Sequence, residues 1–157
     1  MNTNVPHPVA AHITAWFREE NGLDHILRAT LALFQAQTGT LHRLDPATQQ
    51  LHLVAQIGVP PQLLNIVQLI PVGKGIAGQT VVQNRPVTIC NLQTDASGVA
   101  KPGAKQTGVG GAISVPVRRD GAIVGTLGVG IVQEHDYTPA EIESLEAIAT
   151  ALGKIWP

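Results

Sequence analysis

Residues 112–132, AISVPVRRDGAIVGTLGVGIV, decide the fold of this chain. Two apolar runs flank the pair Asp120-Gly121, and a type I′ turn requires positive φ at both of its central residues, which this pair tolerates. The sequence therefore predicts a β-hairpin in which Arg119 faces Ala122. Both faces of that hairpin are largely apolar, so we expect other elements to cover the sheet on both sides.

The turn also sets the predicted register farther along the hairpin. Counting back from the turn, Val117 faces Val124 and Ile113 faces Gly128. Pro116 lies inside the first strand of the pair. Because proline has no N–H to donate, we expect it at a bulge or on an unpaired edge.

The N-terminal part of the chain reads as a tail followed by two helices. Residues 1–8 carry two prolines and no periodic pattern, so we expect a flexible tail before a single domain over 9–157. Apolar residues fall on one helical face from Val9 to Asn21, and Gly22 ends that helix. A second helix is predicted to begin near Asp24 as its N-cap, with Gly39 as its C-terminal glycine.

The hydrophobic period then changes from helix to strand. TLHRLD and LHLVAQIG flank a loop of hairpin length, and a pairing of Asp45 with Leu51 places His42 and His52 on one face. Two imidazoles without a nearby carboxylate or thiol make a poor metal site, so we expect both histidines to pack at the surface or at an interface. The next segment, PPQLLNIVQ, predicts a short helix opened by proline.

The segment PVGKGIAGQTVV, residues 71–82, contains the spacing G-x-G-x-x-G at Gly73, Gly75 and Gly78. Asp95 follows at about the distance at which a dinucleotide fold holds a ribose hydroxyl. A dinucleotide site, however, needs parallel strands joined by a full crossover helix, and the predicted helix of about nine residues is too short. We therefore expect the glycines to bend the chain and start a short helix, whose free N–H groups could hold a small anion or carbonyl.

A glycine-rich loop and a final helix complete the chain. Residues 96–111, ASGVAKPGAKQTGVGG, form a segment too long for a simple connecting turn, and loops of this length are usually functional or disordered. Thr138, Pro139 and Glu141 form a predicted capping box before the last helix. The apolar residues of that helix recur at heptad-like spacing: Ile142, Leu145, Ala149, Leu152 and Trp156. Such a stripe packs on the sheet, on a second subunit, or on both.

Composition excludes several classes of function. Hydrophobic residues make up 44% of the 157 residues, charged residues only 13%, and the net charge is −1. Without a basic patch or many aromatic residues, nucleic-acid binding is not favoured. No apolar run is long enough to span a bilayer and the N-terminus lacks a signal pattern, so we expect a cytoplasmic protein that makes no contact with a membrane.

The sequence offers no catalytic or metal-binding constellation. Its only cysteine, Cys90, cannot form an internal disulfide, and it ends an apolar strand, where core packing is the main interpretation and pocket lining the second. Asp95 is expected to shape the turn after that strand, with a ligand contact as the lesser alternative. Ser114 has no obvious base beside it, so a nucleophilic role is not expected.

Taken together, four stretches resemble the GAF domain family of sensory modules. They are VGKGIAGQTVVQNRPVTI, the acidic residue Asp95 after that strand, GGAISVPVRRDGAIVGTLGV, and YTPAEIESLEAIATAL. The resemblance runs from about residue 10 to residue 155. It implies an α+β fold, GAF- and PAS-like, in which a central antiparallel sheet carries the terminal amphipathic helices on one face and short helices plus a pocket loop on the other.

The resemblance also implies a ligand pocket and a dimer. Mapped onto this sequence, the ligand-binding residues would be Ile76, Ala77, Cys90, Asp95, Thr107 and Ser114. The terminal helices would form the interface of a homodimer. The specialised branches of the family are less well matched, because the loop after the predicted third strand lacks the cysteines of free-methionine sulfoxide reductases and of bilin carriers, and the cyclic-nucleotide signature is missing.

These observations predict a non-enzymatic sensory domain without a cofactor. It would bind a small polar or anionic ligand, which orders the loop at 96–111 and shifts the helices, so that a partner such as a histidine kinase reads the change. Two alternatives remain: a degenerate relative of the sulfoxide reductases acting through Cys90, and a ligand-free structural adaptor that only dimerises.

Overall fold

A six-stranded antiparallel sheet with the strand order β3-β2-β1-β6-β5-β4 organises the chain. The structure is a computed structural model, and it describes residues 8–95 and 108–156. The elements in chain order are α1 (Pro8–Phe17), α2 (Gly22–Phe34), β1 (Thr38–Asp45), β2 (Gln50–Ile57), the 3-10 turn η1 (Pro61–Leu63), α3 (Leu64–Val67), β3 (Leu69–Pro71), α4 (Gly75–Gln83), β4 (Val87–Ile89), β5 (Gly111–Arg119), β6 (Ala122–Ile131) and α5 (Pro139–Ile155).

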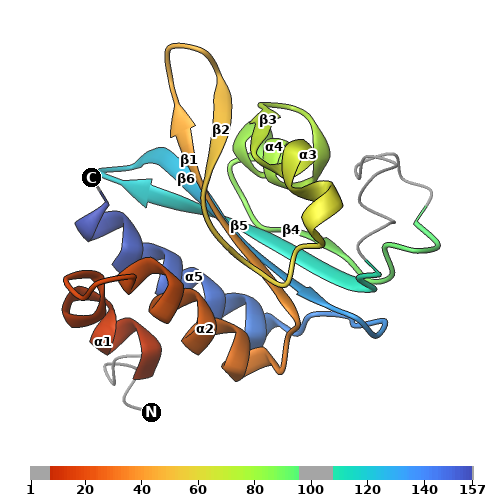
Figure 1. The fold of residues 1–157 in the computed structure, drawn as a ribbon, viewed down its shortest axis with the longest axis horizontal. Helices are drawn as coiled ribbons and strands as arrows, with labels where there is room; N and C mark the ends of the chain where they lie inside the picture. Colours follow the sequence, from red (N-terminus) through yellow and green to blue (C-terminus); the bar gives the residue numbers. More distant parts are fainter. Residues whose placement is uncertain (1–7, 96–107, 157) are drawn as a thin grey trace.

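Helices cover both faces of this sheet. The three long helices α1, α2 and α5 lie on one face, and the short helices α3 and α4 lie on the other (Figure 1). The predicted α+β class and the predicted cover on both faces are confirmed. We call the two sides of the sheet the helix face, under α1, α2 and α5, and the pocket face, under α3 and α4.

The hairpin of β5 and β6 turns where the sequence predicts. Asp120 and Gly121 both have positive φ, 52° and 81°, and Arg119 pairs with Ala122. A β-bulge between Val117 and Arg118 then shifts the ladder, so that Val117 pairs with Gly125 instead of Val124. The predicted register was wrong beyond this point, because a bulge adds one unpaired residue and moves every later partner.

The bulge also changes which residues share a face. Ile113 pairs with Val129 instead of Gly128, and Ser114 pairs with Gly128. Leu127 and Val129 therefore lie with Ile113 on the helix face, while Gly128 and Gly130 lie on the pocket face. The bulge begins after Val117, one residue beyond Pro116, and β4 pairs only with residues 112–114, so the outer edge of β5 carries no strand at the proline.

The hairpin of β1 and β2 also differs from the predicted register. Asp45 pairs with Gln50, not with Leu51, because the Asp45 carboxylate accepts a hydrogen bond from the Ala47 N–H at 3.0 Å and closes a tighter turn. His52 consequently pairs with Arg43, and it does not share a face with His42.

The boundaries of α2 differ from the prediction at both ends. The helix begins at Gly22 after Asn21, not at an Asp24 cap, and it ends at Phe34 with Gln35 in the left-handed region. Gly39 is not its C-terminal residue but part of β1. Gln35 closes the helix by donating its N–H to the carbonyls of the last turn, a role that usually falls to glycine.

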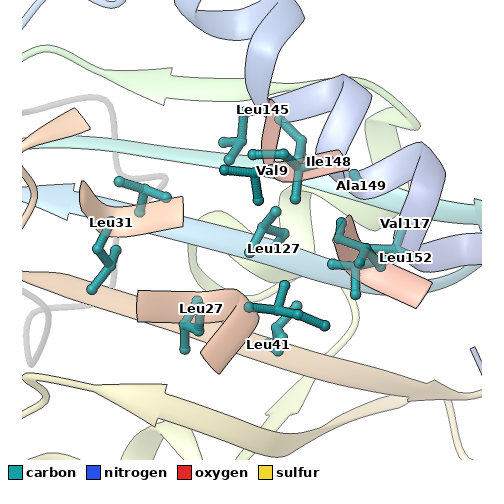
Figure 2. Close-up of a cluster of buried hydrophobic side chains, with 14 of the residues drawn as sticks. Val9, Leu27, Leu31, Leu41, Val117, Leu127, Leu145, Ile148, Ala149 and Leu152 are labelled. Carbon is teal, nitrogen blue, oxygen red and sulfur yellow. The ribbon is translucent and has the colours of Figure 1, made fainter. Parts of the chain in front are cut away.

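The main hydrophobic core lies between the helix face and α1, α2 and α5. Figure 2 shows its centre, where leucines of α2 and α5 meet those of β1 and β6. The fully buried side chains of this core include Ile13, Ile26, Leu27, Leu41, Val115, Leu127, Leu145, Ile148 and Leu152. Helix α5 begins with the predicted capping box of Thr138 and Glu141, and its apolar stripe packs within the chain.

Candidate ligand-binding site

The glycine stretch before α4 bends the chain tightly and starts the helix. Gly73 and Gly75 have φ values of 90° and 64°, which disfavour residues with a side chain. A Cβ atom at Gly78 would lie 2.8 Å from the Pro71 carbonyl oxygen, so only glycine lets the helix sit this close to the preceding strand. Every strand pairing in the sheet is antiparallel, as expected for a loop that does not belong to a dinucleotide fold.

A cavity of about 180 Å³ lies between α4, the η1–α3 segment and the pocket face of the sheet. Its lining comes mainly from β1, α3, α4, β5 and β6, with the hydrophobic side chains Val59, Leu63, Ile70, Leu92 and Val109 from neighbouring segments. Among the residues that the structure describes, no Asp, Glu, Lys or Arg belongs to this lining. The site is therefore largely apolar, with a few polar groups in fixed positions, as is typical of small-molecule pockets.

The sheet register explains why this space is open. Thr40 of β1, Gly128 of β6 and Ser114 of β5 lie in one row across the sheet. The adjacent row places Thr38 beside Gly130. Because both positions of β6 are glycine, β6 adds no side chain here. The Thr40 and Thr38 hydroxyls and Val109 lie over this strand, and a Cβ at Gly128 would come within 2.7 Å of Thr40 Oγ1.

His42 is the most unusual residue of the cavity wall. Its side chain is buried, with the residue only 2% exposed, and Nε2 lies 2.8 Å from the Val67 carbonyl oxygen. A carbonyl oxygen can only accept, so Nε2 carries the proton and Nδ1 has no hydrogen-bond partner. Burial lowers the pKa of His42, against the opposing effect of the hydrogen bond to Val67. The imidazole is therefore neutral at pH 7, and Nδ1 is a buried acceptor without a partner.

Ser114 contributes the second unpaired polar atom of the cavity. It is 3% exposed, and its Oγ has no hydrogen-bond partner, although its carbonyl oxygen lies 3.5 Å from Thr80 Oγ1 of α4. Within residues 8–95 and 108–156, only four buried side-chain nitrogen or oxygen atoms lack a partner, and two of them belong to His42 and Ser114. Unsatisfied buried groups are rare in natural proteins, so their presence on two residues that line the same cavity requires an explanation.

The N-terminus of α4 adds hydrogen-bond donors to the same cavity. Its N-cap residue, Lys74, makes no side-chain cap, and the first intrahelical bond is donated by the Gly78 N–H to the Lys74 carbonyl at 3.0 Å. Gly75, Ile76 and Ala77, which precede that bond, all line the cavity. Their N–H groups are free and carry the positive end of the helix dipole, which favours an oxygen acceptor.

The structure brings together three of the six residues that the sequence assigned to a pocket. Ile76, Ala77 and Ser114 line the cavity, whereas Asp95 and Cys90 do not. Thr107 lies outside the described residues, as do residues 96–106 of the predicted pocket loop.

Cys90 differs from both of its predicted positions. It is exposed instead of packed in the core, and its thiol lies 3.5 Å from Glu134 Oε1. Partial desolvation, followed by the carboxylates of Glu134 and Asp136, raises the pKa of the thiol. The thiolate is therefore disfavoured at neutral pH, and a thiol of this kind is a poor nucleophile.

Sequence reasoning missed the contribution of β1. His42 is buried in the cavity wall instead of packing at the surface or at an interface, and Thr38 and Thr40 line the cavity beside it. The signal was present in the sequence: polar residues at 38, 40 and 42 alternate with Gly39 and Leu41, which is the pattern of a strand with one polar face.

Two other kinds of site do not occur in the described part of the chain. No group of three or more His, Cys, Asp or Glu side chains there could hold a metal ion. None of its helices combines the length and the apolar character needed to cross a membrane.

Comparison with known proteins identifies the fold. The family model of the GAF domain matches residues 19–156. The chain belongs to the GAF domain family. No curated protein matches the sequence significantly.

Solved structures at low sequence identity share this GAF fold. The GAF domain of an Acinetobacter phosphoenolpyruvate-protein phosphotransferase is 17% identical, with a TM-score of 0.78 over 98% of this chain and 93% of that one. The free methionine-R-sulfoxide reductase of Neisseria meningitidis, in complex with its substrate, is 19% identical, with a TM-score of 0.76 over 93% and 84%. The A. aeolicus nlh2 GAF domain, in an inactive state, is 16% identical, with a TM-score of 0.70 over 92% and 91%. The fold therefore occurs both in GAF domains of larger proteins and in a methionine sulfoxide reductase.

Proposed function

We propose that this GAF domain is a non-enzymatic sensory domain that binds a small polar molecule in the cavity between α4 and the sheet. The observation that carries the proposal is the pair of unpaired polar atoms, His42 Nδ1 and Ser114 Oγ, at that cavity. Leaving a buried polar group unsatisfied costs about 1–3 kcal/mol. A ligand that forms hydrogen bonds with both atoms would explain why the protein keeps two buried polar groups that are unsatisfied in its absence.

The properties of Cys90 favour a binding role over a reductase-like role. The chain has one cysteine, which lies outside the cavity lining, and the pKa of its thiol is raised by desolvation and by neighbouring carboxylates. A thiol-based reductase requires an accessible thiolate next to its substrate and a way to resolve the oxidised sulfur.

The construction of the sheet offers a route from the ligand to the long helices. Strand β1 presents Thr40 and His42 to the cavity, while Leu41 between them is fully buried in the core under the long helices. A ligand that moves β1 therefore also moves a side chain packed in the core. A partner protein, for which a histidine kinase is one example, would read the resulting shift of the terminal helices.

We further propose that the domain works as a homodimer built on its terminal helices. The apolar stripe of α5 is used within the chain, so the interface would rest on other residues of these helices, such as the exposed Leu33 of α2. Sedimentation equilibrium tests this part, and a monomer at high protein concentration would contradict it.

Thermal-shift screening tests the binding function directly. A panel of amino acids, amides, carboxylates, nucleotides and oxyanions is added to the protein, and a ligand that binds only the folded state raises its melting temperature by mass action. We expect at least one member to stabilise the wild-type protein but not a variant with a filled cavity, Ala77→Leu. A panel that stabilises neither protein would support the adaptor alternative.

A further inference from the structure

We infer that the cavity selects a small, uncharged ligand that joins an apolar body to a carboxamide-type group, with one N–H donor and one carbonyl acceptor. This inference rests on the proposed function and specifies the chemistry of its ligand. Three features carry it: the size of the cavity, the protonation state of His42, and the donors at the start of α4.

The volume of the cavity limits the ligand to roughly the size of a substituted benzene ring. At about 180 Å³ it is only slightly larger than the cavities of roughly 150 Å³ that accept benzene in proteins. A nucleotide or a tetrapyrrole would extend well beyond this volume. The apolar side chains of Ile66, Ile70 and Val109 in its wall match a hydrocarbon body.

His42 requires a hydrogen-bond donor on the ligand. Its Nε2–H is used by the Val67 carbonyl, which leaves Nδ1 as a lone-pair acceptor. A carboxylate or a nitrate has no hydrogen to donate and would bring its own lone pairs against this nitrogen. An amide N–H or a hydroxyl satisfies it. The sequence-based expectation of a small polar or anionic ligand is thereby narrowed to the uncharged alternative.

Helix α4 and Ser114 define the complementary half of the site. The free N–H groups of Gly75, Ile76 and Ala77 are donors, so the ligand needs an acceptor oxygen to meet them. Ser114 Oγ can donate or accept, and it lies on the strand against which α4 packs through Thr80. A carbonyl oxygen serves these donors without the cost of burying a full charge beside lining residues that, over 8–95 and 108–156, include no charged side chain.

Two matched pairs of probes test this inference: benzamide against benzoate, and isobutyramide against isobutyrate. The members of each pair have nearly the same shape and differ in charge and in the N–H donor. Isothermal titration calorimetry at pH 7.5 should show each amide binding at least tenfold more tightly than its acid. Ser114→Ala should weaken amide binding about fivefold or more, whereas the matched substitution Ser144→Ala on α5 should leave it unchanged.

A spectroscopic measurement separates a ligand contact from a structural effect. The ¹⁵N signal of His42 Nδ1, assigned by comparison with the variant His42→Gln, should move when benzamide is added and stay in place when benzoate is added. This readout uses the wild-type protein, so it remains valid even where a variant folds poorly.

The outcomes distinguish the inference from the function on which it rests. If the carboxylates bind as tightly as the amides, or if only other compounds of the screening panel bind, the ligand class is wrong and the sensory function stands. If neither the probes nor any panel member binds, the proposed function itself fails.

Discussion

Replacing Ser114 by alanine should make the ligand-free protein more stable. The hydroxyl is buried, at 3% exposure of the residue, and has no partner for Oγ. Its removal recovers the desolvation cost of an unsatisfied hydroxyl, about 1–3 kcal/mol, and forfeits a few dispersion contacts of about 0.1–0.2 kcal/mol each. The net expectation is a gain of about 1–2 kcal/mol in the free energy of unfolding.

The expected gain is large enough to measure by thermal denaturation. A chain of 157 residues unfolds with an entropy of roughly 0.33 kcal/mol/K, so the melting temperature of Ser114→Ala should rise by about 3–6 °C. Urea denaturation followed by circular dichroism should show a higher midpoint at an unchanged m value.

The ligand response distinguishes this effect from ordinary stabilisation. The control Ser144→Ala should gain about 0.5 kcal/mol from helix propensity alone, and it should keep the full rise in melting temperature when benzamide is added. Ser114→Ala should have a higher melting temperature than the wild-type protein without ligand, and a smaller rise when benzamide is added. A loss of more than about 0.5 kcal/mol in ligand-free Ser114→Ala would refute the reasoning, because it would mean that the hydroxyl is already satisfied in the free protein.

Four further predictions concern other parts of the fold. Gly153→Ala would place a Cβ of α5 against the Arg118 carbonyl oxygen. Urea denaturation should show a free energy of unfolding lower by about 2 kcal/mol, despite a gain of about 1 kcal/mol in helix propensity. An unchanged free energy of unfolding would mean that α5 does not pack this closely on β5. Thr138→Ala removes the N-cap acceptor of α5 and should cost about 1 kcal/mol in the same assay, and an unchanged midpoint would argue against the capping box. Cys90→Ser should leave both the melting temperature and the benzamide affinity unchanged, and loss of binding would revive a role for the thiol at the site. Because the pKa of His42 is lowered in the fold, His42 takes up a proton in the unfolded chain before it does in the folded protein as the pH falls below about 6.5. This residue should therefore lower the free energy of unfolding toward acid by at most about 1.4 kcal/mol per pH unit. The free energy of unfolding of His42→Gln should fall less steeply between pH 7 and 5, and equal slopes would show that His42 is not buried in its neutral form.

Local chemistry predicted most of the elements of this fold. The turn at Asp120-Gly121 needs only the φ preferences of two residues, and the capping box of α5 needs only Thr138 and Glu141, so both could be found without tertiary information. The resemblance to GAF domains then supplied the order of the layers, which the structure confirms.

Register could not be predicted, because it depends on bulges. The shift after Val117 moves each later partner on β6 by one residue, and it places Leu127 in the core and Gly128 under the cavity. Pro116 indicated a bulge or an unpaired edge, but nothing in the local sequence of either strand fixes the shift after Val117. The tighter turn at Asp45 similarly separates His42 from His52.

Residues that line the cavity were predicted only where they lie next to a recognisable motif. Ile76 and Ala77 follow the glycine stretch, and Ser114 lies in the hairpin, so the resemblance reached all three. His42 was missed because its importance comes from burial and from a carbonyl 25 residues away. Cys90 was placed wrongly because an apolar strand predicts burial for the residue that follows it, whereas β4 ends at Ile89.

A crystal structure of the protein grown with benzamide tests the central claim most directly. The account predicts electron density for the ligand between α4 and the pocket face of the sheet, with its amide nitrogen within about 3.2 Å of His42 Nδ1 and its oxygen at the N-terminus of α4. Density for benzamide elsewhere on the protein, or a cavity closed by its own side chains, would contradict it.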